Sequence, residues 1–404
     1  MGETPQRLLD DWLDSYLQFT EGQESPEKLH LWTALALLSA AIKRQVWLDR
    51  GYYKLFTNIY VLIVAESGEV RKSASIDIGL PILKDAVKDI HTMSDSLTSE
   101  GLIKHMNRIT VHPNEENPDK PIKMTDSHVM IYADELASLF SFDKQRASKM
   151  TMLLTRIYGS PADYEHTTKS DSKIITFNNY VTLLAATDPK NLRVLPEEAI
   201  GGLLGRLIFV TAHERKALIA WPEMTPDRIA LREKLVHDLT LISKIKGEMK
   251  ITQDAKDLFE KWYLVINSRK TDDPTAKSFL ARCHDTALKV ACLIAISRSN
   301  NHLLLESQHV AGGIAFIEKL LPEVSRVISW TANTTFAQNK AKFIDLLRRR
   351  GGCAAHKDLL KSIGINKDDF IVLVNTLFDD GSLKKPLRHL KGMPIYELVD
   401  EMNQ

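Results

Sequence analysis

The stretch that decides the fold is residues 58–73, which read NIYVLIV followed by AESGEVRKS. Residues 58–64 are mostly apolar and rich in β-branched side chains, a composition typical of a buried strand. The pattern then changes to a polar loop with Ser67 and Gly68, and a helical pattern begins at Lys72. A buried strand that leads through a short loop into a helix predicts the first unit of an α/β protein with a mainly parallel sheet.

The loop between this strand and helix carries the side chains that a phosphate-binding loop needs. A helix amino terminus has a positive partial charge and free backbone N–H groups, and both favour a bound anion. In such a loop a lysine contacts the β- and γ-phosphates and the following hydroxyl binds Mg²⁺, roles that Lys72 and Ser73 fit. We therefore predict a nucleotide site that also includes Ser67, Gly68 and Arg71.

The loop nevertheless departs from the usual GxxxxGKS pattern. Ala65 stands at the position of the first glycine, Arg71 precedes the lysine, and the loop is longer by about one residue than the pattern. The alternative interpretation is an exposed, charged turn between a strand and a helix.

A second strand ends in two adjacent carboxylates. Residues 129–135 read VMIYADE, an apolar run followed by Asp134 and Glu135. This is the expected form of a Walker B strand, in which Asp134 holds Mg²⁺ directly or through water and Glu135 polarises the attacking water. The alternative is a strand that runs into an acidic helix cap.

Two further motifs follow at strand ends. The strand at residues 180–186 leads into Thr187, which we predict to act as a sensor of the γ-phosphate or of the attacking water, although a plain Asp-Pro turn is the alternative. Residues 201–206 read GGLLGR and precede the final strand, 207–211. Arg206 is predicted to reach the ATP of a neighbouring subunit as an arginine finger, and a surface arginine on a turn is the alternative.

In this order the motifs resemble the P-loop ATPases of phages, plasmids and integrated elements, which include primase-associated helicases. The resemblance extends from about Trp32 to Trp221 and rests on NIYVLIV, AESGEVRKS, IYADE, AATDP and GGLLGRLIFV. It implies a RecA- or AAA-like P-loop NTPase core that uses ATP and Mg²⁺. It also implies a homo-oligomeric ring, expected to be a hexamer, that moves along single-stranded or forked DNA. A primase or polymerase is the implied partner, and this chain would be the motor part.

Composition and pattern divide the chain into four predicted segments. Residues 1–50 are predicted to be an N-terminal helical segment, 51–215 the ATPase core, 216–335 a helical subdomain and 336–404 a winged helix. The last segment shows three short helices followed by a two-stranded wing, the order of a winged helix. Residues 108–127 contain three prolines and several charges and are predicted to be a surface loop or insertion.

Two groups of basic residues are candidates for contacts with nucleic-acid phosphates. One is Lys169 with Lys173 at a predicted hairpin tip, and the other is Lys384, Lys385 and Arg388 in the wing. Such contacts are salt-dependent and largely independent of base sequence. Solvated surface charge is the alternative for the hairpin tip, and the aspartate-rich third helix of the winged helix leaves docking to a protein equally open for the wing.

Composition excludes several classes of protein. The chain has 53 Lys and Arg against 52 Asp and Glu, so it is neither a polycation nor an acidic tail protein. Its 3 cysteines form no CxxC pair, which argues against a disulfide framework or a zinc ribbon. No apolar run approaches the ~20 residues of a membrane-spanning helix. We expect no membrane association and a cytoplasmic location, in the host cytoplasm for a phage protein.

The leading hypothesis is therefore a Mg²⁺-dependent ATPase that drives a ring-shaped DNA translocase or helicase in the replication of a mobile element. The irregular loop motivates one alternative, a DNA-binding adaptor or helicase loader with a degenerate nucleotide site. A second alternative is an ATPase switch outside replication, for example in defence or packaging.

Overall fold

The computed structural model describes residues 6–94, 97–112, 122–140, 144–167, 173–194, 202–271, 274–299, 303–331, 335–379, 381–384, 389–390 and 393–399. The chain divides into two compact units, Met1–Val324 and Ser325–Gln404. The predicted N-terminal segment and ATPase core both fall in the first unit. The division into four segments stays a prediction.

The first unit is an α/β structure around a five-stranded parallel sheet. The strands are β3 (Tyr60–Val64), β4 (Thr92–Met93), β7 (His128–Ala133), β10 (Tyr180–Thr187) and β11 (Leu207–Thr211). Their spatial order is β11-β3-β10-β7-β4, so β10 lies between β3 and β7. Every residue of β3, β10 and β11 is buried, as expected for parallel strands covered on both faces. The predicted α/β class with a mainly parallel sheet is confirmed.

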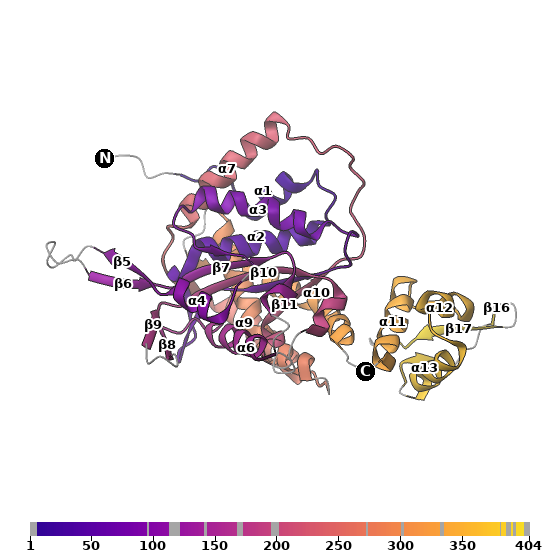
Figure 1. The fold of residues 1–404 in the computed structure, drawn as a ribbon. Helices are drawn as coiled ribbons and strands as arrows, with labels where there is room; N and C mark the ends of the chain where they lie inside the picture. The colour runs from indigo at the N-terminus through magenta and orange to yellow at the C-terminus, as the bar shows by residue number, and fades with distance from the viewer. Residues whose placement is uncertain are drawn as a thin grey trace. The chain divides into compact units, whose positions relative to one another are not determined.

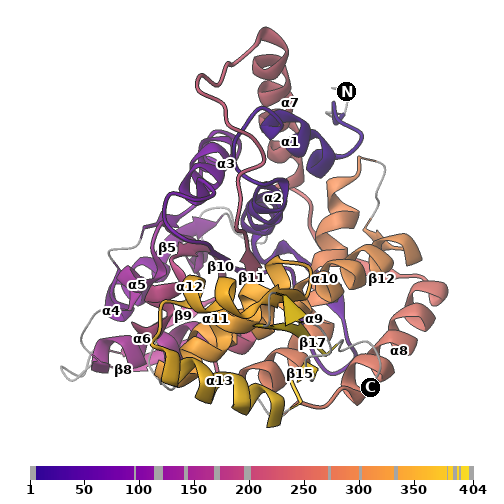
Figure 2. The ribbon, with the colours of Figure 1, turned by 90° about the vertical axis from the view of Figure 1, so that its right-hand side faces the viewer.

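Helices cover both faces of this sheet. One layer consists of α1 (Trp12–Thr20), α2 (Glu27–Ile42), α3 (Lys72–Ala86) and α7 (Pro226–Ile242). The other includes α4 (Ser99–Met106), α6 (Lys144–Ile157) and α9 (Pro274–Ser297). Figure 1 shows the strands β7, β10 and β11 between these layers, and the view in Figure 2 agrees. Ser39 of α2 hydrogen-bonds Thr182 of β10 at 2.8 Å, which fixes the central helix to the sheet.

A second sheet joins segments that are far apart in the sequence. Its order is β13 (Leu304–Leu305), β12 (Gly247–Ile251), β1 (Val46–Asp49) and β2 (Lys54–Phe56). The predicted N-terminal helical segment, residues 1–50, thus also contributes the strand β1. Helix α2 ends at Ile42, its C-cap Lys43 has a φ of 57°, and the chain becomes extended at β1. The segment predicted as a helical subdomain likewise contributes β12, together with α8 (Gln253–Ser268) and α10 (Ser307–Thr331).

Two hairpins extend the loops of the parallel sheet. The predicted surface loop or insertion at 108–127 contains an antiparallel pair that was not predicted, β5 (Arg108–His112) and β6 (Ile122–Asp126). The prolines that suggested a loop lie between the two strands in the sequence. The segment as a whole therefore does not show the pattern of a strand pair. The hairpin predicted before β10 is confirmed as β8 (Asp163–Thr167) paired with β9 (Lys173–Phe177). The short helix α5 (Leu136–Leu139) follows β7.

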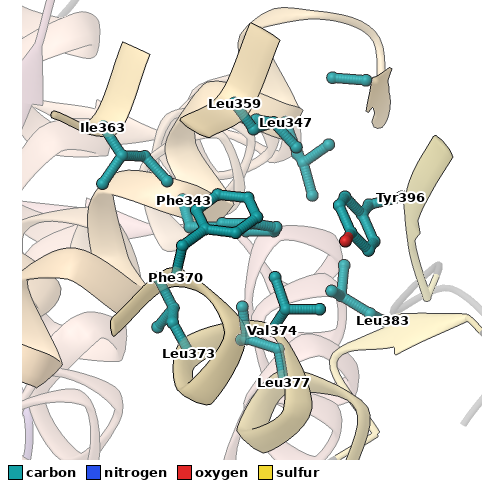
Figure 3. Close-up of a cluster of buried hydrophobic side chains, with 11 residues drawn as sticks. Phe343, Leu347, Leu359, Ile363, Phe370, Leu373, Val374, Leu377, Leu383 and Tyr396 are labelled. Atoms are coloured by element: carbon teal, nitrogen blue, oxygen red, sulfur yellow. The ribbon is translucent and has the colours of Figure 1, made fainter. Parts of the chain in front are cut away.

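The second unit contains the three predicted helices and an antiparallel sheet. The helices are α11 (Thr335–Arg349), α12 (His356–Ile363) and α13 (Lys367–Asp379), and the strands are β14 (Cys353–Ala355), β15 (Leu383–Lys384), β16 (His389–Leu390) and β17 (Met393–Leu398). Strand β14 was not predicted, and it pairs with β17. Figure 3 shows Phe343, Phe370 and Tyr396 packed at the centre, with ring centroids of Phe343 5.7 Å from Phe370 and 5.9 Å from Tyr396. This cluster gives the second unit a hydrophobic core of its own.

Helices long and apolar enough to cross a bilayer are absent from the part of the chain that the structure describes.

Candidate active site

The carboxyl ends of three central strands meet at one edge of the parallel sheet. Val64, the last residue of β3, pairs with Thr187 of β10 and with Thr211 of β11. Ala133 of β7 pairs with Ala185 of β10, so the residues that follow β7 lie level with the end of β10. Ligands bind at this edge in open α/β sheets. The strand order thus brings the segments after β3, β7 and β10 into one place.

The loop of residues 65–71 between β3 and α3 is held by an arginine from another part of the chain. Arg215 donates from Nη2 to the carbonyl of Gly68 at 2.9 Å and from Nε to the carbonyl of Glu69 at 3.1 Å. Its Nη1 also lies 3.6 Å from the carboxylate of Glu24. Gly68 has φ +81°, which glycine adopts without strain. The loop is therefore fixed through its carbonyl groups on one side.

Arg71 adopts a conformation that is unusual for its residue type. Its φ is 53° and ψ is 45°, the left-handed region, which costs about 1–2 kcal/mol for a residue with a side chain. Two contacts offset this cost: Nε donates to Glu24 at 2.8 Å, and the hydroxyl of Ser25 donates to the Arg71 carbonyl at 2.9 Å. The backbone thus has the conformation that the usual glycine allows, whereas the Arg71 side chain is engaged with Glu24.

Lys72 begins α3 and faces the other strand ends. Its Nζ donates to the carbonyl of Ala65 at 2.8 Å, across the base of the loop. Burial lowers the pKa of Lys72, while the carboxylates of Glu135 and Asp188 act in the opposite direction. The ammonium group therefore lies within electrostatic reach of residues that follow β7 and β10.

Glu135 is held by the end of β10. The hydroxyl of Thr187 donates to Oε1 of Glu135 at 2.5 Å, and the amide of Asp188 donates to Oε2 at 3.3 Å. Thr187 is only 1% exposed, so its hydroxyl orients the carboxylate from a buried position. Both carboxylate oxygens of Glu135 accept a bond, and this restricts the carboxylate to one orientation.

Asp188 contacts the phosphate-loop candidate directly. Its Oδ2 accepts the amide of Ser67 at 3.0 Å, and its Oδ1 accepts the amide of Lys190 at 3.0 Å. Burial acts to raise the pKa of Asp188, but the bonds from Lys190 and Ser67 together with the charge of Lys72 act in the opposite direction, and the pKa is lowered. A carboxylate thus accepts the Ser67 N–H, one of the loop amides that the predicted nucleotide site would offer to phosphate.

Asp134 and Ser73 lie on facing elements. Burial raises the pKa of Asp77 on α3, and the charge of Asp134 raises it further, so the two carboxylates are close. Asp77 follows Ser73 by four positions on the same helix and therefore shares its face. Asp134 is exposed at the end of β7, near that face.

This oxygen donor set fits Mg²⁺, which takes one or two protein ligands together with substrate phosphates and water. Among the described residues no group of three or more His, Cys, Asp or Glu side chains is arranged to hold a metal ion. A magnesium site completed by nucleotide phosphates needs no such group. Ser73 and Asp134 would then supply the protein oxygens.

Arg206 lies away from this cluster. It immediately precedes β11, whose first residue, Leu207, pairs with Tyr60 at the start of β3. The side chain is therefore at the amino edge of the sheet, with Nη1 donating to the carbonyl of Gly202 at 2.6 Å. The structure brings Lys72, Glu135 and Thr187 together and leaves Arg206 at the opposite edge.

The structure describes only some of the residues predicted to contact nucleic acid. Lys169, Lys385 and Arg388 lie outside the described residues, and Lys173 is the first residue of β9. Lys384 of β15 forms an ion pair with Glu397 of β17 at 2.6 Å, directly across the strand pair. A phosphate contact by Lys384 would have to compete with that carboxylate.

Comparisons with known proteins leave the chain without an assigned family. Neither the models of protein families nor the curated protein sequences contain a match to it.

Three residues of the site were not predicted from the sequence. Arg215 and Glu24 brace the loop, and Asp188 caps it. Asp188 could have been predicted from the sequence, because it follows Thr187 at the end of a buried strand. Arg215 and Glu24 belong to no motif, and they are far from the loop in the sequence, so only the folded chain reveals their role.

Proposed function

We propose that this chain is a Mg²⁺-dependent ATPase whose site lies at the carboxyl edge of the parallel sheet. One observation carries the proposal: Lys72 at the start of α3 lies within electrostatic reach of Glu135 after β7 and Asp188 after β10. A lysine at a helix amino terminus, opposite carboxylates on neighbouring strand ends, is the arrangement that phosphoryl transfer from a nucleotide requires.

Binding is assigned to the loop and the first turn of α3. The backbone N–H groups of Lys72 and Ser73 have no partner within the helix. They would donate hydrogen bonds to phosphate oxygens, and the helix dipole would favour the bound anion. The Lys72 ammonium group would neutralise charge on the β- and γ-phosphates. When bound, Mg²⁺ stabilises the charge that develops on the transferred phosphoryl group, and Ser73 and Asp134 would hold it.

Glu135 is assigned the proton transfer. Its carboxylate would accept a proton from the water that attacks the γ-phosphate. Thr187 and the Asp188 amide hold that carboxylate in place, so Thr187 acts as a positioning residue through Glu135. The carboxylate of Asp188 lies at the loop and would repel a phosphate, so nucleotide binding has to displace it from the Ser67 amide.

The resemblance to helicases of mobile elements supports a DNA motor as the use of this ATPase. Arg206 is at the opposite edge of the sheet from Lys72 and cannot reach the nucleotide of its own chain. A finger role for Arg206 therefore requires a neighbouring copy in a head-to-tail assembly, and such an assembly forms a ring when its rotation closes. We propose a ring-shaped translocase or helicase that acts on single-stranded or forked DNA.

A second candidate function is an adaptor or loader that binds nucleotide with little turnover. The observation in its favour is the loop itself, in which Arg71 is bound to Glu24 and a carboxylate contacts the Ser67 amide. It predicts retention of ATP without hydrolysis by the unaltered chain.

The test is ATP turnover by the purified full chain with Mg²⁺, with and without single-stranded DNA. We expect hydrolysis that DNA stimulates. We expect Glu135→Gln to bind ATP and release it slowly without hydrolysis, whereas Glu214→Gln, which changes an exposed carboxylate beyond β11, keeps full activity. Retention of ATP without turnover in the unaltered chain would favour the adaptor, and a Glu135→Gln chain with normal turnover would remove Glu135 from the mechanism.

A further inference from the structure

A cavity of about 650 Å³ opens at the amino edge of the parallel sheet, away from the phosphate loop. Its walls include Asn58, just before β3, and Tyr158, just after α6. Arg206, just before β11, lies in the same wall. The volume is within the range of small-molecule sites, about 300–1,000 Å³.

The charge of this cavity is strongly unbalanced. Its lining includes five cationic side chains and one carboxylate, namely Lys54, Arg156, Arg206, Arg282, Lys289 and Asp285. The carboxylate of Asp285 is also shared with the hydroxyl of Tyr53, which donates to it at 3.2 Å. One acid therefore faces several bases.

Two arginines of the cavity are each held by hydrogen bonds from Nη1, and their other N–H groups remain available to a ligand. Arg206 uses Nη1 for the carbonyl of Gly202, and Arg282 uses Nη1 for the carbonyl and hydroxyl of Ser278, at 2.9 and 2.6 Å. Within the described part of the chain, neither guanidinium makes a hydrogen bond through Nε or Nη2. Burial lowers the pKa of Arg206, and the charge of Arg282 lowers it further, so the two cations are close enough to repel each other.

Lys289 adds a buried amine behind them. It is 3% exposed, and its Nζ donates to the backbone carbonyl of Asn58 at 2.9 Å and to the side-chain oxygen of Asn58 at 3.0 Å. The same nitrogen lies 3.9 Å from the ring centroid of Tyr158, and the guanidinium of Arg206 lies 5.9 Å from that centroid. Both cationic groups therefore lie close to the Tyr158 ring.

Buried charge without a counter-charge is costly, and proteins retain it where a ligand supplies the missing partner. Arginine pairs with free donors suit phosphate oxygens, which accept two parallel bonds from one guanidinium. We propose that this cavity is a second phosphate-binding site, for a ligand that carries two or three linked phosphates. Arg206 and Arg282 bind the phosphates. The Lys289 ammonium group, which contacts Asn58 and the Tyr158 ring, adds positive charge nearby.

The phosphates can come from a free molecule or from a nucleotide held by another copy of the chain. The first arm of the test measures calorimetric binding of inorganic tripolyphosphate to the full chain with Lys72→Ala, which removes the lysine of the other site. The second arm measures self-association of the Glu135→Gln chain with ATP and Mg²⁺. Arg282→Gln is introduced in both arms.

If the ligand is free, tripolyphosphate binds to the Lys72→Ala chain and Arg282→Gln weakens binding about ten- to hundredfold, the cost of a charged hydrogen bond. If the ligand sits on a neighbour, the first arm shows no binding, and ATP promotes association that Arg282→Gln removes. Lys289→Met provides a second variant, and Lys261→Met, an exposed lysine on α8, is the control. The proposal would be overturned if folded Arg282→Gln and Lys289→Met chains bind tripolyphosphate and self-associate with ATP to the same extent as the chains without these changes.

Discussion

The two edges of one parallel sheet carry opposite charge arrangements. At the carboxyl edge, Lys72 faces Glu135 and Asp188, and a continuous set of hydrogen bonds links these groups to the loop. At the amino edge, Arg206 and Arg282 approach each other with a single carboxylate nearby. The first edge compensates its own charge, and we propose that it carries the chemistry, whereas the second has an excess of positive charge, for which we propose a bound anion.

The largest effect is expected at the carboxyl edge. Lys72→Ala removes the only ammonium group assigned to the β- and γ-phosphates, and we expect ATP turnover to fall about 1000-fold or more, as for loss of an arginine finger. The measurement is steady-state hydrolysis at saturating ATP, with circular dichroism to confirm the fold.

Lys88→Ala is the matched control for that change, because Lys88 is exposed beyond the end of α3 and lies 3.9 Å from the carboxylate of Asp85. It should keep full turnover. If Lys72→Ala hydrolyses ATP as fast as Lys88→Ala does, the carboxyl edge is not the active site.

A smaller effect is expected for Thr187→Val. This change removes the hydroxyl that orients Glu135, and hydrogen bonds to charged groups contribute about 1.5–3 kcal/mol. We expect kcat to fall about ten- to hundredfold with little change in KM, because Thr187 acts through Glu135 rather than on ATP. Thr187→Ser keeps a hydroxyl and should restore most of the rate. A rise in KM at constant kcat would instead place Thr187 in contact with the nucleotide.

The smallest expected effect concerns Lys289 at the amino edge, and it is a change in the free energy of unfolding with pH. Burial lowers the pKa of Lys289 to about 7, with a further contribution from Arg206, whereas the unfolded value is about 10.4. Below pH 7 both states carry the proton and the full cost of the buried charge destabilises the fold. Between pH 7 and 10 the folded state releases the proton, so that cost declines.

We therefore expect the unaltered chain to gain unfolding free energy relative to Lys289→Met as pH rises from 7 to 10, by up to about 1.4 kcal/mol per pH unit. Urea unfolding of both chains at pH 6, 7.5 and 9 measures this difference. A difference that stays constant over this range would show that the amine of Lys289 keeps an ordinary pKa, and would weaken the argument for unbalanced charge in the cavity.

The sequence predicted the strands that are buried on both faces and the β8–β9 hairpin, and it missed several other strands. Residues of β3 and β10 form continuous apolar runs, which are visible without knowledge of their partners. Strand β1 has an alternating burial pattern, and it pairs with β2, which follows it closely, as well as with β12, far later in the sequence. Strands β1 and β2 have only 4 and 3 residues, too few to give a clear strand pattern in the sequence. Strands β5 and β6 were obscured by the prolines between them.

The same distinction applies to the candidate site. Lys72, Asp134 and Glu135 were found because each directly follows or begins a recognisable element. Arg215 was not, because its contacts are with backbone carbonyls of Gly68 and Glu69, and any residue type with a long donor side chain can make them. Groups that bind backbone leave no pattern in a single sequence.

In the proposed mechanism, Lys72 and Glu135 act on one bound triphosphate. A crystal structure of the full chain with Mg²⁺ and a non-hydrolysable ATP analogue would test this. We predict a γ-phosphate in contact with Nζ of Lys72, with Glu135 on its far side beside an ordered water. An analogue bound without any phosphate contact to Lys72, or with Glu135 too distant to share that water, would contradict it.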